Sequence, residues 1–441
     1  MLDRPIMNDL ASHAYRRFHE PHAARRAALA CMAALAVALG IGRFAFTPLL
    51  PLMLHGAALG QPHLDIQHGG WLASFNYAGY FVGAMTCAAL RAEPARMVRV
   101  GLAATVLLTL AMGVTGQFWV WALVRFVAGA VSAWTFVFAS QWGLRRLAEL
   151  GAHAWSGVIY TGPGVGIVGT GLLVSVAGGY GAVTGWIGFA VIGAVLTALV
   201  WPVFGDTRRV AAARPVVASA ATAKPAAGSR ASANPPPRTV GVPTSTSRAD
   251  AFWLVLLYGI PGFGYIITAT FLPVIARHAL PGSAWPDLFW PMFGAALIVG
   301  ALFAARLPLH WDNRALLAGS YVLQAFGIAL GIVWPTAGGF SLGSILIGLP
   351  FTAITLFAMR EARRLRGDDA AGLMGYATAA YGIGQIAGPL VAAPIAAHTG
   401  SFSLALWLAA GALLAGAAGL IAVMRVPRGP RRGRMPDCGC S

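Results

Sequence analysis

Charged residues are scarce in this chain of 441 residues. They make up 10% of the sequence, and only 14 of them are acidic, whereas about a quarter of the residues in a typical soluble domain are charged. Hydrophobic residues make up 58%, and the mean hydropathy is +0.70. The shortage of charge excludes an ordinary soluble domain and indicates a membrane protein.

The sequence also lacks the residues that enzymes and metal proteins need. Its four cysteines form no disulfide framework, and no His or further Cys lies close enough to Cys438 and Cys440 to complete a metal site. The phosphate-binding loop of ATP-driven pumps is missing, and the apolar stretches hold no paired nucleophile and base. We therefore expect no enzymatic activity, no metal and no cofactor.

Twelve apolar stretches are each long enough to cross a bilayer as a helix. A lipid-exposed backbone must satisfy its own hydrogen bonds, and these stretches are too long and too uniformly apolar for the strands of a barrel. The sequence thus predicts an all-α membrane protein with twelve transmembrane helices, at about residues 27–54, 69–90, 97–116, 119–142, 154–178, 182–204, 250–276, 286–305, 314–334, 339–359, 372–397 and 402–424.

The basic residues predict how the chain is oriented. If both termini are cytoplasmic, the interior loops hold nearly all loop arginines, such as Arg91 and Arg145, and the exterior loops hold only Arg277. The net charge of +17 then faces anionic lipid rather than nucleic acid. No cleavable signal peptide is evident. We expect a multi-pass protein of a bacterial-type inner membrane, with both termini cytoplasmic.

A segment rich in Ala, Pro, Ser and Arg, without aromatic residues, follows the sixth stretch. It cannot bury a core, so it is expected to be a disordered cytoplasmic linker. The predicted organisation is a cytoplasmic tail at 1–26, a six-helix bundle at 27–204, the linker at 205–249, a second six-helix bundle at 250–424 and a cytoplasmic tail at 425–441.

The two halves resemble each other in sequence. GIGRFAFTPLLPLM at 40–53 aligns without gaps with GFGYIITATFLPVI at 262–275, which places Tyr265 at the position of Arg43. Shorter matches follow in the same order, and together they predict a duplication. They are 79–84 with 296–301, 133–139 with 352–358, and a Gly-Pro pair in both the fifth and eleventh stretches, Gly162–Pro163 and Gly388–Pro389.

A duplicated protein of six plus six helices resembles the major facilitator superfamily of secondary transporters, whose substrate site lies between two repeat halves. GIGRFAFTPLLPLM followed by GGWLASFNYAGYFVGA at 69–84 is similar to the YbfB/YjiJ family of that superfamily. Arg125 and Gly129 fit the superfamily's fourth-helix pattern, but Cys87 and Ala88 stand where an Asp is expected after the second helix. The resemblance covers residues 27–424.

Two arginines, Arg43 and Arg125, lie within the first and fourth stretches, roughly 10–16 Å below the exterior surface at 1.5 Å per residue. No carboxylate within a stretch could neutralise them. Because the resemblance implies that these helices line the central cavity, we expect both guanidinium groups to bind an anionic substrate. The alternative is that they bind carbonyls freed where the first helix breaks near Pro48 and Pro51.

Other polar residues in the predicted helices are weaker candidates. Asn76, Tyr80, Tyr265 and Gln385 complete the predicted substrate-binding set. Glycines and prolines are expected to allow close packing and bending of the helices. They are Pro48, Pro51, Gly129, Gly162, Pro163, Gly388 and Pro389.

The predicted function is secondary transport of a small organic anion by alternating access, carried out by a monomer in the lipid bilayer. One alternative is an exporter of amphipathic drugs or metabolites by proton antiport. A second is a non-transporting membrane sensor, although the sequence offers no cytoplasmic output domain. No histidine lies centrally in a predicted helix, so coupling to a proton stays open.

Overall fold

The computed structural model describes residues 22–55, 64–87, 89–90, 92–205, 245–304, 306–308, 310–367 and 370–426. These residues are mainly helical and include no β-strand. Ten stretches among them are long and apolar enough to span a membrane, and one, His153–Val200, contains two long helices. The all-α membrane fold is therefore confirmed. The predicted tails and linker lie almost wholly outside the described residues.

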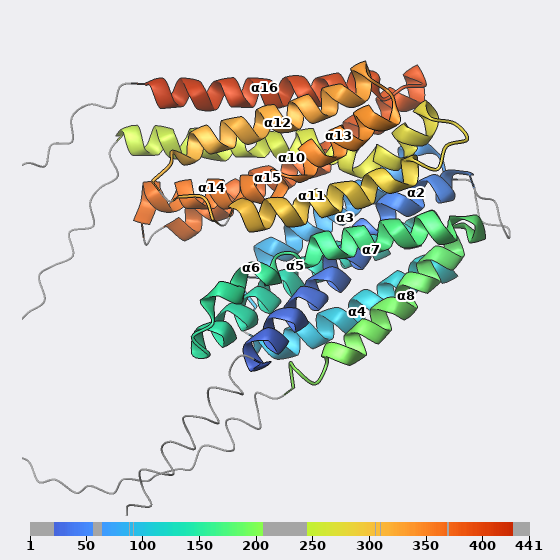
Figure 1. The fold of residues 1–441 in the computed structure, drawn as a ribbon, viewed down its shortest axis with the longest axis horizontal. Helices are drawn as coiled ribbons and strands as arrows, with labels where there is room; N and C mark the ends of the chain where they lie inside the picture. The colour runs from blue at the N-terminus through green and yellow to red at the C-terminus, as the bar shows by residue number, and fades with distance from the viewer. Residues whose placement is uncertain are drawn as a thin grey trace, which may run out of the picture.

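The first half of the chain forms one helical bundle (Figure 1). Its first helix is described from residue 22 and passes through a π-helical segment, η1 (Ala36–Phe44), into α2 (Phe46–His55). The helices that follow are α3 (Ile66–Thr86), α4 (Pro94–Val114), α5 (Phe118–Glu149), η2 (His153–Trp155), α6 (Ser156–Ile159), α7 (Gly162–Ala177), η3 (Gly178–Tyr180) and α8 (Gly181–Val200).

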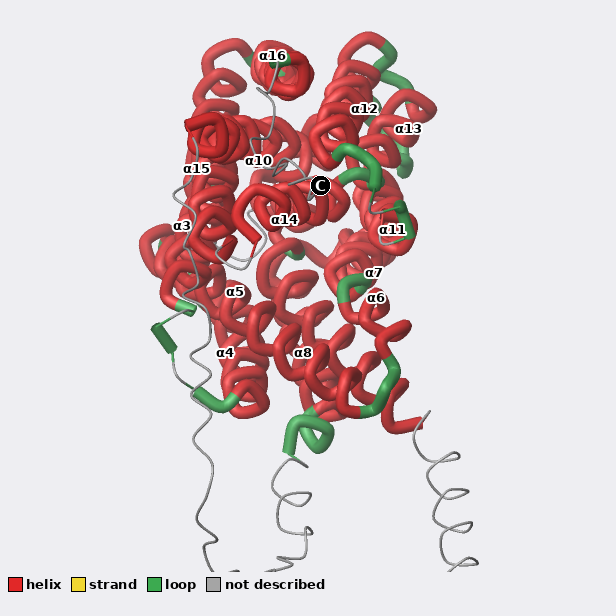
Figure 2. The backbone as a smooth tube through the Cα atoms, turned by 90° about the vertical axis from the view of Figure 1, so that its left-hand side faces the viewer, coloured by secondary structure: helices red, strands yellow, loops and turns green. Residues whose placement is uncertain are grey.

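The second half forms a second bundle, which Figure 2 shows stacked on the first. The predicted helix at 339–359 is divided at Leu349 and Pro350, because proline cannot continue the hydrogen bonding of a helix interior. The helices are α10 (Ser245–Ala279), α11 (Pro286–Ala304), α12 (Asn313–Val333), α13 (Ala337–Gly348), α14 (Phe351–Arg366), α15 (Ala370–Thr399) and α16 (Ser403–Arg425).

The two bundles meet mainly along the helix pairs α3 with α15, α7 with α11, and α2 with α10. We call the end of the molecule where α2 finishes the α2 end, and the opposite end the α14 end. In Figure 1 the bundles converge toward the α2 end and spread apart toward the α14 end. Thr47 donates a hydrogen bond of 3.0 Å to the carbonyl of Ala269, its own counterpart in the repeat alignment. Tyr77 and Thr270 lie 2.9 Å apart at the same interface.

Glycines set the helix spacing at equivalent places in the two halves. A Cβ atom added to Gly129 would lie 2.0 Å from the carbonyl oxygen of Asn76. At the repeat counterpart Gly348, it would lie 2.4 Å from the carbonyl oxygen of Phe293. The backbones of α3 and α5, and of α11 and α13, are therefore in contact at matching positions, as small residues allow in membrane bundles. The shared packing supports the predicted duplication.

Gly129→Ala is expected to destabilise the protein, because the added methyl group would force α3 and α5 apart. Overpacking of this kind costs about 1–3 kcal/mol, so the melting temperature of the purified protein should fall by several degrees. Gly188→Ala on α8 is the matched control, since a Cβ atom there meets nothing within 4 Å. Equal melting temperatures for the two variants would contradict the predicted contact.

Candidate functional site

The first helix widens into a π-helix immediately before α2. All nine residues of this segment, Ala36–Phe44, are buried. It contains Gly40, whose added Cβ atom would lie 2.4 Å from the Cα atom of Gly166 on α7. Helical turns of this type are rare and are often found at functional sites. The sequence predicted a break near Pro48 and Pro51, whereas the irregular backbone lies before both prolines and ends next to Arg43.

Arg125 is the buried centre of the first bundle, with a side chain that is 2% exposed. Its Nη1 and Nη2 donate hydrogen bonds of 3.4 and 3.3 Å to the carbonyl oxygens of Gly42 and Arg43 in the π-helix. Its Nε donates to the carbonyl of Leu72 on α3 at 3.5 Å. The guanidinium also lies 4.6 Å from the ring centroid of Phe46. Arg125 therefore joins three helices through backbone oxygens.

Pro48 helps to explain one of these bonds, the one to the Arg43 carbonyl. It has no N–H, so it cannot donate to the carbonyl four or five residues earlier, at Phe44 or Arg43. An unpaired carbonyl inside a membrane costs several kcal/mol. Arg125 supplies a donor to the Arg43 carbonyl. This geometry corresponds to the alternative interpretation of the sequence, in which an arginine binds freed carbonyls.

Arg43 lies at the boundary between the bundles and has a different environment. Its Nη2 donates a hydrogen bond of 3.0 Å to the amide oxygen of Gln385 on α15, and the amide nitrogen of Gln385 donates to the hydroxyl of Tyr265 on α10. The guanidinium carbon lies 4.0 Å from the ring centroid of Tyr80 and 5.1 Å from that of Tyr77. Arg43 is 5% exposed, and its Nε has no hydrogen-bond partner.

Four of the six predicted binding residues are thus in one cluster: Arg43, Tyr80, Tyr265 and Gln385. We call these residues the Arg43 cluster. Asn76 lies outside it, and its Nδ2 donates a hydrogen bond of 2.8 Å to the Arg125 carbonyl. Tyr77, which completes the aromatic surroundings of Arg43, was not in the predicted set. The i, i+3 spacing of Tyr77 and Tyr80 indicates that the two rings share one helix face.

Neither arginine has an acidic partner among the salt bridges of the described residues. Those pairs include Asp65 with His68, Asp287 with Arg277, and Glu361 with Arg314 and Arg364. All of them lie at or near helix ends, so the charges of Arg43 and Arg125 are met by carbonyls, an amide and aromatic rings. A charge at membrane depth without a counter-charge is costly and usually functional.

The pair of Asp65 and His68 at the α2 end is about half exposed to solvent. Asp65 accepts a hydrogen bond of 2.7 Å from the backbone N–H of His68, and its other oxygen lies 2.7 Å from Nδ1 of the His68 ring. Partial burial opposes ionisation of Asp65, but the hydrogen bonds and charge of His68 outweigh it, and the pKa of Asp65 is below its ordinary value. Both side chains are about half exposed or more, so this pair caps α3.

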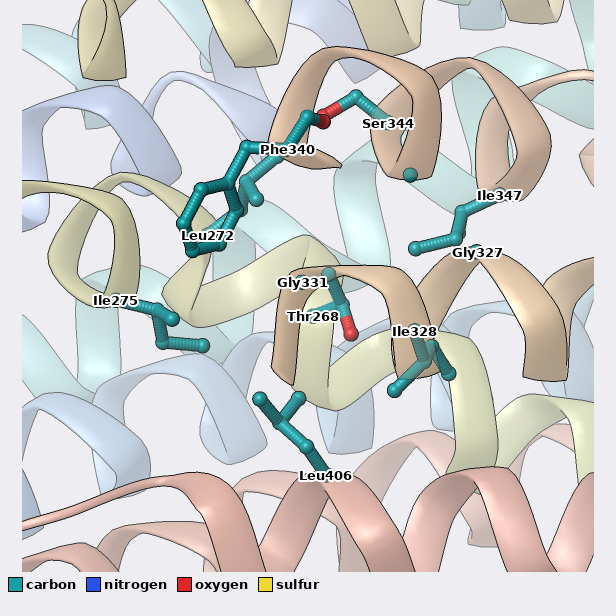
Figure 3. Close-up of a pocket in the computed structure, with 11 residues that line it drawn as sticks. Thr268, Leu272, Ile275, Gly327, Ile328, Gly331, Phe340, Ser344, Ile347 and Leu406 are labelled. Carbon is teal, nitrogen blue, oxygen red and sulfur yellow. The ribbon is translucent and has the colours of Figure 1, made fainter. Parts of the chain in front are cut away.

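One pocket within the second bundle and one between the two bundles contain neither arginine. The smaller, of about 20 Å³, has room for one water molecule, and Thr268, Ile328 and Leu406 point toward it in Figure 3. The hydroxyl of Thr268 has no hydrogen-bond partner. The larger, of about 530 Å³, lies at the α2 end and includes Leu54 and His278.

The predicted bending positions are placed as follows. Gly162 begins α7 after a break from α6, and its added Cβ atom would lie 2.4 Å from the carbonyl of Met32. Pro163 lies in the first turn of α7, where proline fits a helix. An added Cβ atom on Gly388 would lie 2.3 Å from the Ile266 side chain. Pro48 and Pro51 lie within α2, and Pro389 lies within α15.

Comparison with solved structures identifies the fold. The crystal structure of a mutant of the nucleoside transporter NupG is similar with a TM-score of 0.66 and 14% sequence identity, over 90% of this chain and 100% of that one. At this identity the likeness shows a shared fold alone. No curated protein matches the sequence.

Comparison with protein families gives a more specific result. The family described as "Uncharacterised MFS-type transporter YbfB" matches residues 35–233 and 210–422, which together include most of both bundles and both arginines. The match confirms the resemblance drawn from the first and second helices, and with it the assignment as a transporter rather than an enzyme. The chain belongs to this YbfB family of membrane transporters in the major facilitator superfamily.

Proposed function

We propose that this protein is a secondary transporter that moves a small organic anion by alternating access and binds it at Arg43. The proposal includes twelve transmembrane helices, cytoplasmic termini, a bacterial-type inner membrane and a monomeric state. The observation that carries the proposal is the buried guanidinium of Arg43, which lies between the bundles. It has no carboxylate partner among the described residues, and its Nε is unpartnered. An anionic solute would supply the missing counter-charge.

The present partner of Arg43 is replaceable. Gln385 is neutral and accepts one hydrogen bond from Nη2, whereas a carboxylate can accept two parallel hydrogen bonds from a guanidinium and adds a negative charge. Charge-assisted bonds are about twice as strong as neutral ones. A carboxylate at this position would therefore displace the amide oxygen and also use the free Nε.

Exchange of this partner connects binding to movement of the bundles. Arg43 belongs to the first bundle, and Gln385 and Tyr265 belong to the second. The contact between them is one of several that close the α2 end, together with Thr47–Ala269 and Tyr77–Thr270. A solute that replaces Gln385 removes one of these contacts and shifts the balance between conformations by its different affinity for each.

The role of Arg125 in this proposal is to position Arg43. Its guanidinium is directed at the carbonyls of Gly42 and Arg43 and is 2% exposed. It supports the π-helix that presents Arg43 to the second bundle. Direct contact between Arg125 and the solute, the role that the sequence favoured, is the competing assignment.

Arg43→Ala is expected to lower the apparent affinity for transported anions about 10- to 100-fold, the effect of losing hydrogen bonds to a charged group. Counterflow in proteoliposomes with a panel of carboxylates, phosphates and organic cations measures this loss. Arg145→Ala is the control, because that side chain is exposed at the α14 end. Unimpaired anion transport by Arg43→Ala would contradict the anion site. If the wild-type protein transports only cations, driven by a proton gradient, the result would favour the drug exporter. If the wild-type protein transports none of these solutes, the result would favour a sensor.

Arg125→Ala is expected to lower the melting temperature, because it removes a donor from three buried backbone carbonyls, and a buried polar group left without its partner costs about 1–3 kcal/mol. Arg125→Lys should restore part of the stability, since lysine keeps the charge but lacks the planar arrangement of donors. A variant with an unchanged melting temperature and lost anion binding would instead indicate direct contact between Arg125 and the solute.

A further inference from the structure

The Arg43 cluster offers one positive charge to a solute. Of the two intramembrane arginines, Arg125 already donates to three backbone carbonyls from Nε, Nη1 and Nη2. Arg43 donates a hydrogen bond to the neutral amide of Gln385 and has an unpartnered Nε. A single carboxylate satisfies this site, and a second carboxylate on the same solute would be desolvated there without a cation to meet it.

The surroundings of Arg43 are aromatic. Tyr80 lies with its ring centroid 4.0 Å from the guanidinium carbon. Tyr265, which accepts the hydrogen bond from Gln385, lies edge-on to Phe351 at 4.9 Å and nearly parallel to Tyr381 at 6.0 Å. These rings come from α3, α10, α14 and α15, so both bundles contribute to them.

Three of these rings have surface that the protein does not cover. Arg43, Tyr265 and Gln385 are buried, whereas Tyr80, Tyr381 and Phe351 are each only partly buried. Along their helices, Tyr80 and Tyr381 lie one turn closer to the α14 end than Tyr77 and Gln385. The partly uncovered residues Tyr80 and Tyr381 therefore lie toward the α14 end from Tyr77 and Gln385, which contact Arg43.

We propose that the transported solute is a monocarboxylate with a flat aromatic body, an inference that rests on the anion transport proposed above. Its carboxylate takes the place of the Gln385 amide oxygen on Arg43. Its ring lies against the uncovered parts of Tyr80, Tyr381 and Phe351, in the edge-to-face and offset arrangements that aromatic pairs prefer. One charge and one flat ring match one guanidinium that has no carboxylate partner among the described residues, together with its aromatic surroundings.

Isothermal titration of the purified full-length protein tests this inference with four matched probes: benzoate, cyclohexanecarboxylate, terephthalate and benzamide. Benzoate should bind about threefold to tenfold more tightly than the saturated acid, the effect of aromatic contacts beyond buried area. It should bind at least about tenfold more tightly than the dianion, whose second charge has no partner, and than the neutral amide.

Variants of Tyr80 test whether this residue causes the preference for benzoate over cyclohexanecarboxylate. Tyr80→Leu should bring the ratio of benzoate to cyclohexanecarboxylate affinity close to one, because it removes an aromatic face beside Arg43. Tyr80→Phe keeps that face and should keep the ratio. Tyr376→Leu on α15 is the control, since Tyr376 is 71% exposed and has no place in the Arg43 cluster.

The outcomes separate this inference from the proposed function. Equal affinities for benzoate and cyclohexanecarboxylate would overturn the aromatic assignment, and equal affinities for benzoate and terephthalate would overturn the single charge. Counterflow of aliphatic or phosphorylated anions that depends on Arg43, without binding of benzoate, would end this inference and leave anion transport standing. If no anion binds and Arg43→Ala leaves transport unchanged, both the aromatic monocarboxylate inference and the proposed anion transport are wrong.

Discussion

A guanidinium group in a membrane must find partners for its charge and its five N–H groups, and the protein meets this requirement in two ways. Arg125 is satisfied internally by carbonyls of η1 and α3. Arg43 is satisfied only in part, by an amide from the other bundle and by aromatic faces. The first arrangement stabilises one bundle, whereas the second leaves bonding capacity at the boundary of two bundles that a transporter must move. The different roles of the two arginines follow from this difference.

The π-helix links the two arginines. Gly40 and Gly42 allow close approach to α7 and α4, where added Cβ atoms would lie 2.4 Å from Gly166 and 2.8 Å from Thr105. Pro48 removes the donor that the Arg43 or Phe44 carbonyl would otherwise receive. Arg125 then bonds the exposed backbone oxygens, and the same segment carries the Arg43 side chain toward α15. The irregular backbone of η1, the buried charge of Arg125 and the position of Arg43 at the boundary between the bundles thus depend on one another.

The fold could be predicted from the sequence because the hydropathy of a whole helix and the charge of a whole loop are each summed over many residues. A single unusual residue therefore does not change the prediction. The Arg43 cluster could be predicted in part. Arg43 is a charged residue in an otherwise uncharged predicted helix, and the repeat alignment places Tyr265 at its position. The partner of Arg43 could not be derived, because the contact with Gln385 joins residues far apart in sequence and depends on how the bundles dock. The division between α13 and α14 was also missed, although Pro350 was there to indicate it.

Comparison of the two repeat halves shows which features they share and which differ between them. Gly129 and Gly348 make the same backbone contacts, so the packing is common to both halves. At the polar positions the halves differ. Arg43 corresponds to Tyr265, and Arg125 corresponds to Ser344, whose hydroxyl bonds to the Phe340 carbonyl on its own helix. The second half thus has no intramembrane cation at either position, and it contributes an amide and aromatic rings to the boundary. A solute held there is bound by charge from one bundle and by ring surface from both, so its binding depends on how the two bundles are placed.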